Sequence, residues 1–244
     1  MFEGINAGLD SVFGFLLGWS PLVSILLVST VVSLIIVISY KYLTDQKEMK
    51  RLKDELASHQ KKMKEIKEPE KLMAVQKDAM ALNMQYMTKS MKPTLITFLP
   101  IILIFGWMNA HFAFEPLLPN EEFLLTAQVK DAQNVSIVVP DGLSLTSAAT
   151  AEVQDGIAKF NLKGEEGKYL VTLQGNGEEV DKDIIISSTR TYASVSQAYS
   201  SNVFESVALG NEKLIVFWKI GWLGTYIIAA ILLSTVLRKL LKVY

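Results

Sequence analysis

The sequence has no cysteine and only two histidines among its 244 residues. The absence of cysteine excludes disulfide bonds, thiolate metal sites and cysteine nucleophiles, although it does not identify the compartment. The scarcity of histidine argues against a metal centre. The chain also lacks a phosphate-binding glycine loop, a nucleophile elbow and an acidic pair within its apolar runs. We therefore predict neither an enzyme nor a bound cofactor.

Charge is missing from three long stretches of the chain. No Asp, Glu, Lys or Arg occurs in residues 11–40, 93–114 or 220–237. Half of all residues are hydrophobic and the mean hydropathy is +0.28, which is too apolar for a soluble domain of this charge content. Because about 20 apolar residues cross a bilayer as a helix, we predict an α-helical membrane protein. Its three transmembrane helices are expected at residues 20–40, 93–114 and 214–237.

The charges beside these stretches are distributed unevenly. Residues 41–92 hold 13 Lys and Arg against 8 Asp and Glu, and the tail at 238–244 adds three basic residues and no acid. The rest of the chain holds 8 basic and 17 acidic residues. Because basic loops stay in the cytoplasm, we place residues 41–92 and the basic tail inside. The N-terminus and residues 115–213 are then outside the cell (plasma) membrane.

The tryptophans favour the same orientation. All four tryptophans, Trp19, Trp107, Trp218 and Trp222, fall at the predicted outer ends of the spans, which is typical of an interfacial belt.

Residues 1–19 place Phe2, Ile5, Leu9 and Phe13 at helical spacing. This spacing predicts a short amphipathic helix in the outer interface, and a frayed start to the first span is the alternative.

Residues 41–92 have the spacing of a coiled-coil hairpin. Steps of three and four are typical of packed helices, and they occur in the run Met49, Leu52, Leu56, His59, Met63, Ile66. After Pro69 a second stripe follows at Met73, Met80, Met84, Met87 and Met91. The methionines are either the hairpin seam or a flexible surface, at Met80, Met84, Met87 and Met91, that guides apolar passengers.

The predicted hairpin tip is rich in lysine. The set comprises Lys61, Lys62, Lys64, Lys67 and Lys71. Such side chains are candidates for contact with ribosomal RNA phosphates or with anionic lipid. Acidic residues are interleaved among them, so a simply solvated face is the alternative interpretation.

Residues 115–213 have a different character from the rest. Apolar residues alternate with polar ones in residues 158–162 and 169–173, and turn signals occur at Asp155-Gly156 and Asn176-Gly177. Asn-Gly is a strong signal for a β-hairpin. We therefore predict an extracytoplasmic all-β, sandwich-like domain inserted between the second and third spans. Residues 190–213 are expected to be a connector along its outer surface.

Hydroxyl groups gather in the inner halves of the predicted spans. The candidate groove-lining residues are Ser29, Ser33, Tyr40, Thr94, Thr97 and Ser234. If they face one another, they form a polar groove that shortens the hydrocarbon barrier for a hydrophilic passenger. The alternative is that these side chains join helices or bond to their own backbone.

Several short runs resemble a known family. They are Met91-Lys92-Pro93-Thr94, Phe98-Leu99-Pro100 and Phe105-Gly106-Trp107 in the second span, with residues 221–226 and 238–242 around the third. With a span and a charged hairpin before them, their order resembles the archaeal YidC-like proteins of the Oxa/YidC/Alb insertase superfamily. The resemblance covers residues 21–114 and 214–244.

The resemblance implies an insertase that consumes no nucleotide, with three spans around a hydrophilic groove and a hairpin that receives substrate from the ribosome. The chain departs from the bacterial pattern twice. The first span has no groove arginine, only Lys41 at its inner end, and a β domain replaces two further spans. The partners expected are membrane lipids, nascent membrane proteins, the ribosome and further membrane subunits. A receptor or scaffold, and an oligomeric channel subunit, are the alternatives.

Overall fold

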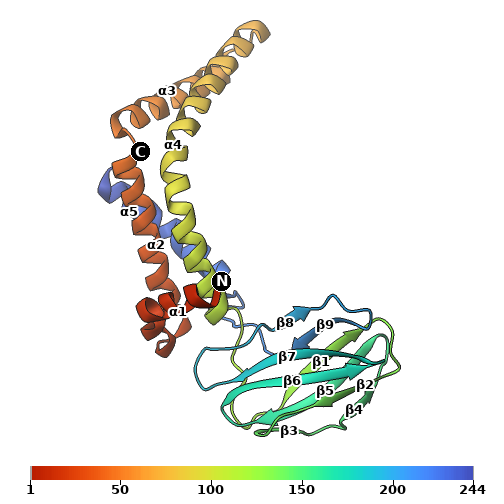
Figure 1. Cartoon of the computed structure of the whole chain (residues 1–244). Helices are drawn as coiled ribbons and strands as arrows, with labels where there is room; N and C mark the ends of the chain where they lie inside the picture. The colour runs from red at the N-terminus through yellow and green to blue at the C-terminus, as the bar shows by residue number, and fades with distance from the viewer. Residues whose placement is uncertain (1, 244) are drawn as a thin grey trace. The chain divides into compact units, whose positions relative to one another are not determined.

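Figure 1 shows the computed structural model of the chain, which describes the backbone of residues 2–243 and the side chains of residues 8–243. These residues form two compact units. One contains the helices of residues 22–106 and 223–243, and the other contains residues 6–21 and 107–222.

Three helices are long and apolar enough to cross a membrane: α2 (Pro21–Leu43), α4 (Pro69–Phe112) and α5 (Trp222–Leu241). The three apolar helices predicted from the sequence are therefore confirmed. The prediction that the third span begins at residue 214 is wrong. Residues 217–220 form a tight turn instead, and α5 begins at Trp222 and continues into the predicted tail.

Helix α4 joins the second hairpin arm to the second span. It has 44 residues, which corresponds to about 66 Å at 1.5 Å per residue. Pro93 and Pro100 lie inside it, and each removes one backbone donor. Figure 1 shows the helix as curved and continuous. The predicted boundary at residues 92 and 93 is therefore not a break in structure.

The N-terminal segment forms helix α1 (Phe2–Phe13) and the short 3-10 helix η1 (Gly14–Gly18). A helix was predicted here. Its amphipathic face relied on Phe2 and Ile5, whose side chains lie outside the described residues, so its place in the interface stays a prediction.

Helix α3 (Gln46–Glu65) and α4 form the two arms of a helical hairpin, with residues 66–68 between them. Met49 and Leu52 on α3 are fully buried, and the other members of the predicted α3 stripe are partly buried. On α4 the partly buried positions are Leu72, Val75, Ala79, Leu82, Tyr86 and Ser90. The five methionines of the predicted stripe, at positions 73, 80, 84, 87 and 91, are exposed, so they are not the seam of the hairpin.

The β domain has nine strands, two sheets and one core. The strands are β1 (Phe123–Val129), β2 (Asn134–Val138), β3 (Leu143–Leu145), β4 (Thr150–Glu152), β5 (Ile157–Gly164), β6 (Gly167–Gly175), β7 (Glu178–Ile186), β8 (Ser196–Ala198) and β9 (Phe204–Leu209). One sheet has the order β3-β5-β1-β9-β8 and the other β4-β2-β6-β7. Leu125 and Phe160 from the first sheet share a core with Leu173 from the second. The predicted all-β domain is confirmed.

The prediction of a connector over residues 190–213 is wrong. Strands β8 and β9 lie in this segment, and β9 pairs with β1 inside the five-stranded sheet. A register shift between Gln128 and Val129 interrupts that pairing. Phe204, Val207 and Leu209 are the buried residues of β9. A bulge interrupts the alternation of buried and exposed residues along a strand. The buried residues of β9 are therefore not all spaced by two, and the sequence pattern does not predict a strand here.

Strand β7 is an edge of the four-stranded sheet and carries a buried lysine. The Lys182 side chain is fully buried, and its Nζ donates a hydrogen bond to the carbonyl of Ser194. Burial lowers the pKa of Lys182, because a charged group loses hydration inside the domain. An inward-pointing charge on an edge strand disfavours pairing with a second sheet. Lys182 is such an inward-pointing residue on an edge strand.

Candidate functional site

One face of α4 is apolar and exposed from the hairpin into the span. We call this face the α4 track, and its members are Met73, Met80, Met84, Met87, Met91, Leu95, Phe98 and Ile102. Their side chains are between 44% and 67% exposed. At 100° per residue the eight positions fall within about 40° of one line along the helix. From Met80 to Ile102 the track is therefore a continuous apolar surface that ends in the membrane span, whereas the exposed residues Gln76 and Lys77 separate Met73 from it.

The methionines give the first part of the track a special property. Met is unbranched and polarisable, so it adapts to apolar partners of different shape. The opposite face of α4 packs in the hairpin, so the track stays uncovered by α3. Of the two interpretations of the stripe, the exposed positions of Met80, Met84, Met87 and Met91 favour a contact surface over a seam.

A polar cluster joins α2, α4 and α5 near the hairpin ends of α2 and α5. Tyr40 Oη and Thr94 Oγ1 lie 2.9 Å apart and share a hydrogen bond. The Arg238 guanidinium carbon lies 4.9 Å from the centroid of the Tyr40 ring, which is within the range of a cation–π contact. These three residues, the Tyr40 cluster, place a positive charge and two hydroxyls where three membrane helices meet.

Arg238 was not among the candidate site residues predicted from the sequence. It was assigned to a basic tail, whereas it lies in the last turn of α5. One feature of the sequence points to Arg238: it and Tyr40 both lie at the predicted inner ends of their spans. Only the arrangement of α5 beside α2 brings the guanidinium over the Tyr40 ring.

The other predicted groove residues are arranged differently. Ser29, Ser33 and Thr97 are buried. The Ser29 hydroxyl donates to the carbonyl of Ile25 at 2.7 Å, and the Thr97 hydroxyl donates to that of Pro93 at 3.0 Å.

Thr94 and Ser234 also bond within their own helices, since the Thr94 hydroxyl donates to Ser90 and that of Ser234 to Ile231. A helix offers such a hydroxyl an acceptor one turn earlier, which is the nearest partner in apolar surroundings. Of the six predicted residues, the structure brings Tyr40 and Thr94 together.

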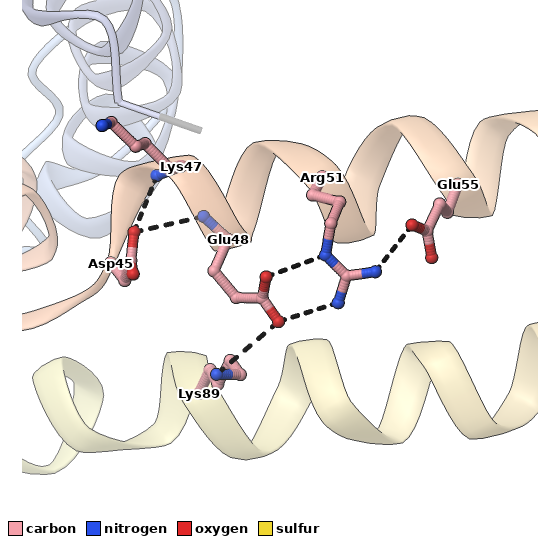
Figure 2. Close-up of polar contacts among 6 residues, drawn as sticks. All are labelled: Asp45, Lys47, Glu48, Arg51, Glu55 and Lys89. Atoms are coloured by element: carbon pink, nitrogen blue, oxygen red, sulfur yellow. Dashed lines mark hydrogen bonds and ion pairs between the residues drawn. The ribbon is translucent and has the colours of Figure 1, made fainter.

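Charged residues fix the base of the hairpin, as Figure 2 shows. The Asp45 side chain accepts hydrogen bonds from the backbone N–H groups of Lys47 and Glu48, which caps α3. Arg51 donates to Glu48 at 2.8 Å, and Lys89 of α4 lies 3.8 Å from Glu48. The hydrogen bond from Arg51 lowers the pKa of Glu48. The exposed network adds little stability, and its pair of Lys89 with Glu48 is an ion pair between α4 and α3.

The lysines predicted at the hairpin tip are all exposed. Lys67 lies in the connection of residues 66–68, and the other four flank it. Lys71 Nζ lies 2.8 Å from a Glu68 carboxylate oxygen, so one of the five has an acidic partner. Lys62 and Lys64 lie in the last turn of α3, where cations are favourable because of the helix dipole. The tip is therefore a basic surface with partial neutralisation.

The second unit contains a cluster of charged and aromatic residues at the end of α4. Trp107 is fully buried, and its Nε1 donates to Asp10 at 2.7 Å, so its predicted place in the interfacial belt is wrong. His111 Nε2 lies 3.1 Å from Asp10, and its Nδ1 lies 2.7 Å from the carbonyl oxygen of Arg190. Arg190 donates to the carbonyl of Leu17 at 2.9 Å. These contacts join the N-terminal segment to the β domain.

Comparison with known proteins gives one family. No curated protein and no solved structure matches the chain. The family model described as "Integral membrane protein EMC3/TMCO1-like" matches residues 10–147, which include α2, α3, α4 and the first three strands. In general terms that family belongs to the Oxa1/YidC/Alb3 insertase superfamily, so the expected superfamily is confirmed. The match is to the EMC3/TMCO1-like family and not specifically to the archaeal YidC-like proteins that the sequence resembles. The chain belongs to the EMC3/TMCO1-like family of integral membrane proteins.

Proposed function

We propose that the protein is a membrane insertase of the YidC-like type. It receives newly made apolar segments at the cytoplasmic face and passes them into the bilayer without nucleotide hydrolysis. In this proposal the hairpin and the C-terminus are cytoplasmic, and the N-terminus and the β domain lie outside the plasma membrane. The basic residues of the hairpin and tail support this orientation.

The α4 track is the observation on which the proposal rests. An apolar segment that leaves the ribosome needs a surface that shields it from water until it reaches lipid. The track offers such a surface over one helix face, from Met80 in the hairpin to Ile102 in the span. Because α4 is continuous, a segment that moves along it passes from cytoplasm to bilayer without leaving an apolar contact.

The Tyr40 cluster supplies the polar part of the route. A charged side chain at the centre of a bilayer costs about 2.5 to 3.5 kcal/mol on insertion scales. Hydroxyls and a cation at the cytoplasmic end of the spans lower the cost for a hydrophilic tail that enters beside the apolar segment. The first span, α2, lacks the groove arginine of the bacterial proteins. In this proposal Arg238 on α5 supplies that positive charge instead.

Crosslinking during synthesis tests this function. Photoreactive residues at Met84 and Met91 are expected to capture a short membrane protein made in the presence of vesicles that contain the full chain. Gln85 is an exposed position on another face of the same helix, so it serves as the control. Adducts of equal strength from Gln85 and Met84, or adducts with lipid only, contradict the proposal.

A second prediction concerns Arg238. Replacement by glutamine is expected to reduce insertion of substrates with an acidic translocated tail about fivefold, because a partly exposed cation such as Arg238 contributes about 1 kcal/mol to such attraction. Substrates with a neutral tail are expected to insert normally. Arg238→Lys keeps the charge and is the control. Insertion measured by protease protection gives both values, and an equal loss for both kinds of tail indicates that Arg238 acts only on stability.

The basic hairpin tip supports a contact with ribosomal RNA. Its lysines lie at the end of a projecting hairpin, and phosphate contacts weaken as salt rises. The full chain is expected to cosediment with ribosomes at low salt, and the bound fraction is expected to fall as salt rises. No cosedimentation at low salt contradicts this contact.

A further inference from the structure

A tight hairpin connects the β domain to α5. The Phe217 N–H donates to the Ile220 carbonyl at 3.3 Å, and the Ile220 N–H donates to the Phe217 carbonyl at 2.8 Å. The two residues between them, Trp218 and Lys219, have φ angles of 46° and 79°. Positive φ is unfavourable for residues with a Cβ atom, and especially for bulky ones. The turn therefore holds both residues in a strained conformation.

Two other turns of the same domain also have two consecutive residues at positive φ, but with residue types that favour it. Asp155-Gly156 has φ angles of 51° and 75°, and Asn176-Gly177 has φ angles of 48° and 82°. Asp-Gly and Asn-Gly are the pairs that such hairpin turns favour. The turn before α5 has Trp and Lys in these places in spite of the strain. Strain of this kind points to a role for the side chains.

The side chains of this hairpin form an exposed apolar and basic surface. Trp218 is 83% exposed, Ile215 is 64% exposed and Phe217 is 53% exposed. Lys219 is also exposed, and α5 begins at Trp222. The chain therefore enters a membrane span three residues after the turn. Tryptophan prefers the layer where acyl chains meet headgroups, and an ammonium group suits the lipid phosphates just above that layer.

We propose that residues 215–220 form a lipid-binding wedge that attaches the β domain to the membrane surface. Trp218, Phe217 and Ile215 enter the headgroup layer of the bilayer, and Lys219 binds lipid phosphate. The occupant is the lipid surface itself, since the adjoining span places these residues beside it. The wedge is independent of the insertase activity proposed above.

Fluorescence of a labelled cysteine tests the wedge. The chain has no native cysteine, so Ile215→Cys in the full protein accepts one environment-sensitive label. The protein is reconstituted into phosphatidylcholine vesicles with a minority of phosphatidylglycerol and with spin-labelled lipid as quencher. Leu170→Cys is the matched control, because Leu170 is 52% exposed on β6 of the same domain. Quenching is expected to be at least about threefold stronger at position 215, as an interfacial site requires.

The variant W218N/K219G separates the fold of the turn from its contact. It converts the turn to the Asn-Gly pair found at residues 176 and 177, so the melting temperature of the β domain is expected to stay equal or rise. Quenching of the label at position 215 is expected to fall toward that of the Leu170 control. Equal quenching at the two positions in the parent protein overturns the proposal. Unchanged quenching in W218N/K219G overturns it too, because chain connectivity alone then accounts for the contact.

Discussion

Joint replacement of Met80, Met84, Met87 and Met91 by glutamine is expected to lower the yield of inserted substrate at least about tenfold. Burying a methionine side chain contributes about 1.5 to 3 kcal/mol. If a passing segment covers about a third of each side chain, the four together contribute about 3 kcal/mol, or about a hundredfold in capture. The measurement is protease protection of a short membrane protein in reconstituted vesicles.

The structure offers a matched control for this replacement. Ala74 and Ala81 are exposed on α4 but lie about 80° or more from the line of the track at 100° per residue. Their exchange for glutamine adds polar groups to the same helix and is expected to leave insertion unchanged. Glutamine is also a good helix former, so both variants are expected to keep the helicity measured by circular dichroism. Normal insertion by the methionine variant contradicts a role for the α4 track.

Replacement of Phe160 by alanine is expected to destabilise the β domain by about 3 to 5 kcal/mol, the usual cost of deleting a buried phenylalanine. Phe160 is fully buried on β5, which pairs with both β1 and β3. Its loss leaves a cavity in the core that both sheets share. Such a cost is a large part of the stability of a small domain. Pulse proteolysis of the full chain in urea measures the change.

Lys159 is the control for this substitution. It is the exposed neighbour of Phe160 on the same strand, and Lys159→Ala is expected to change stability by less than about 0.5 kcal/mol. Because the two residues point to opposite faces of the sheet, equal effects contradict the assigned core. The Phe160 variant also tests whether the β domain takes part in insertion. Substrate insertion is measured under conditions in which pulse proteolysis shows the β domain of the variant to be unfolded.

Part of the candidate site was predictable from residue types alone. The stripe of methionines has helical spacing in the sequence, and its exposure was one of two stated interpretations. The groove residues show the opposite case. Ser29 and Thr97 were expected to face a polar groove, but their hydroxyls bond to their own helices. Sequence spacing identifies the face of a helix, whereas the partner of a hydroxyl depends on which acceptor is nearer in space.

The sequence by itself determined the number of apolar helices, the hairpin and the all-β domain. These depend on quantities that add up along the chain, such as the length of an apolar run, the spacing of apolar residues and turn residues like Asn176-Gly177. The tertiary structure decided which faces are covered. It exposed the methionines of the α4 track, buried Trp107, placed β9 in a sheet and brought Arg238 to Tyr40. The physical reason is that burial and pairing depend on neighbours distant in sequence.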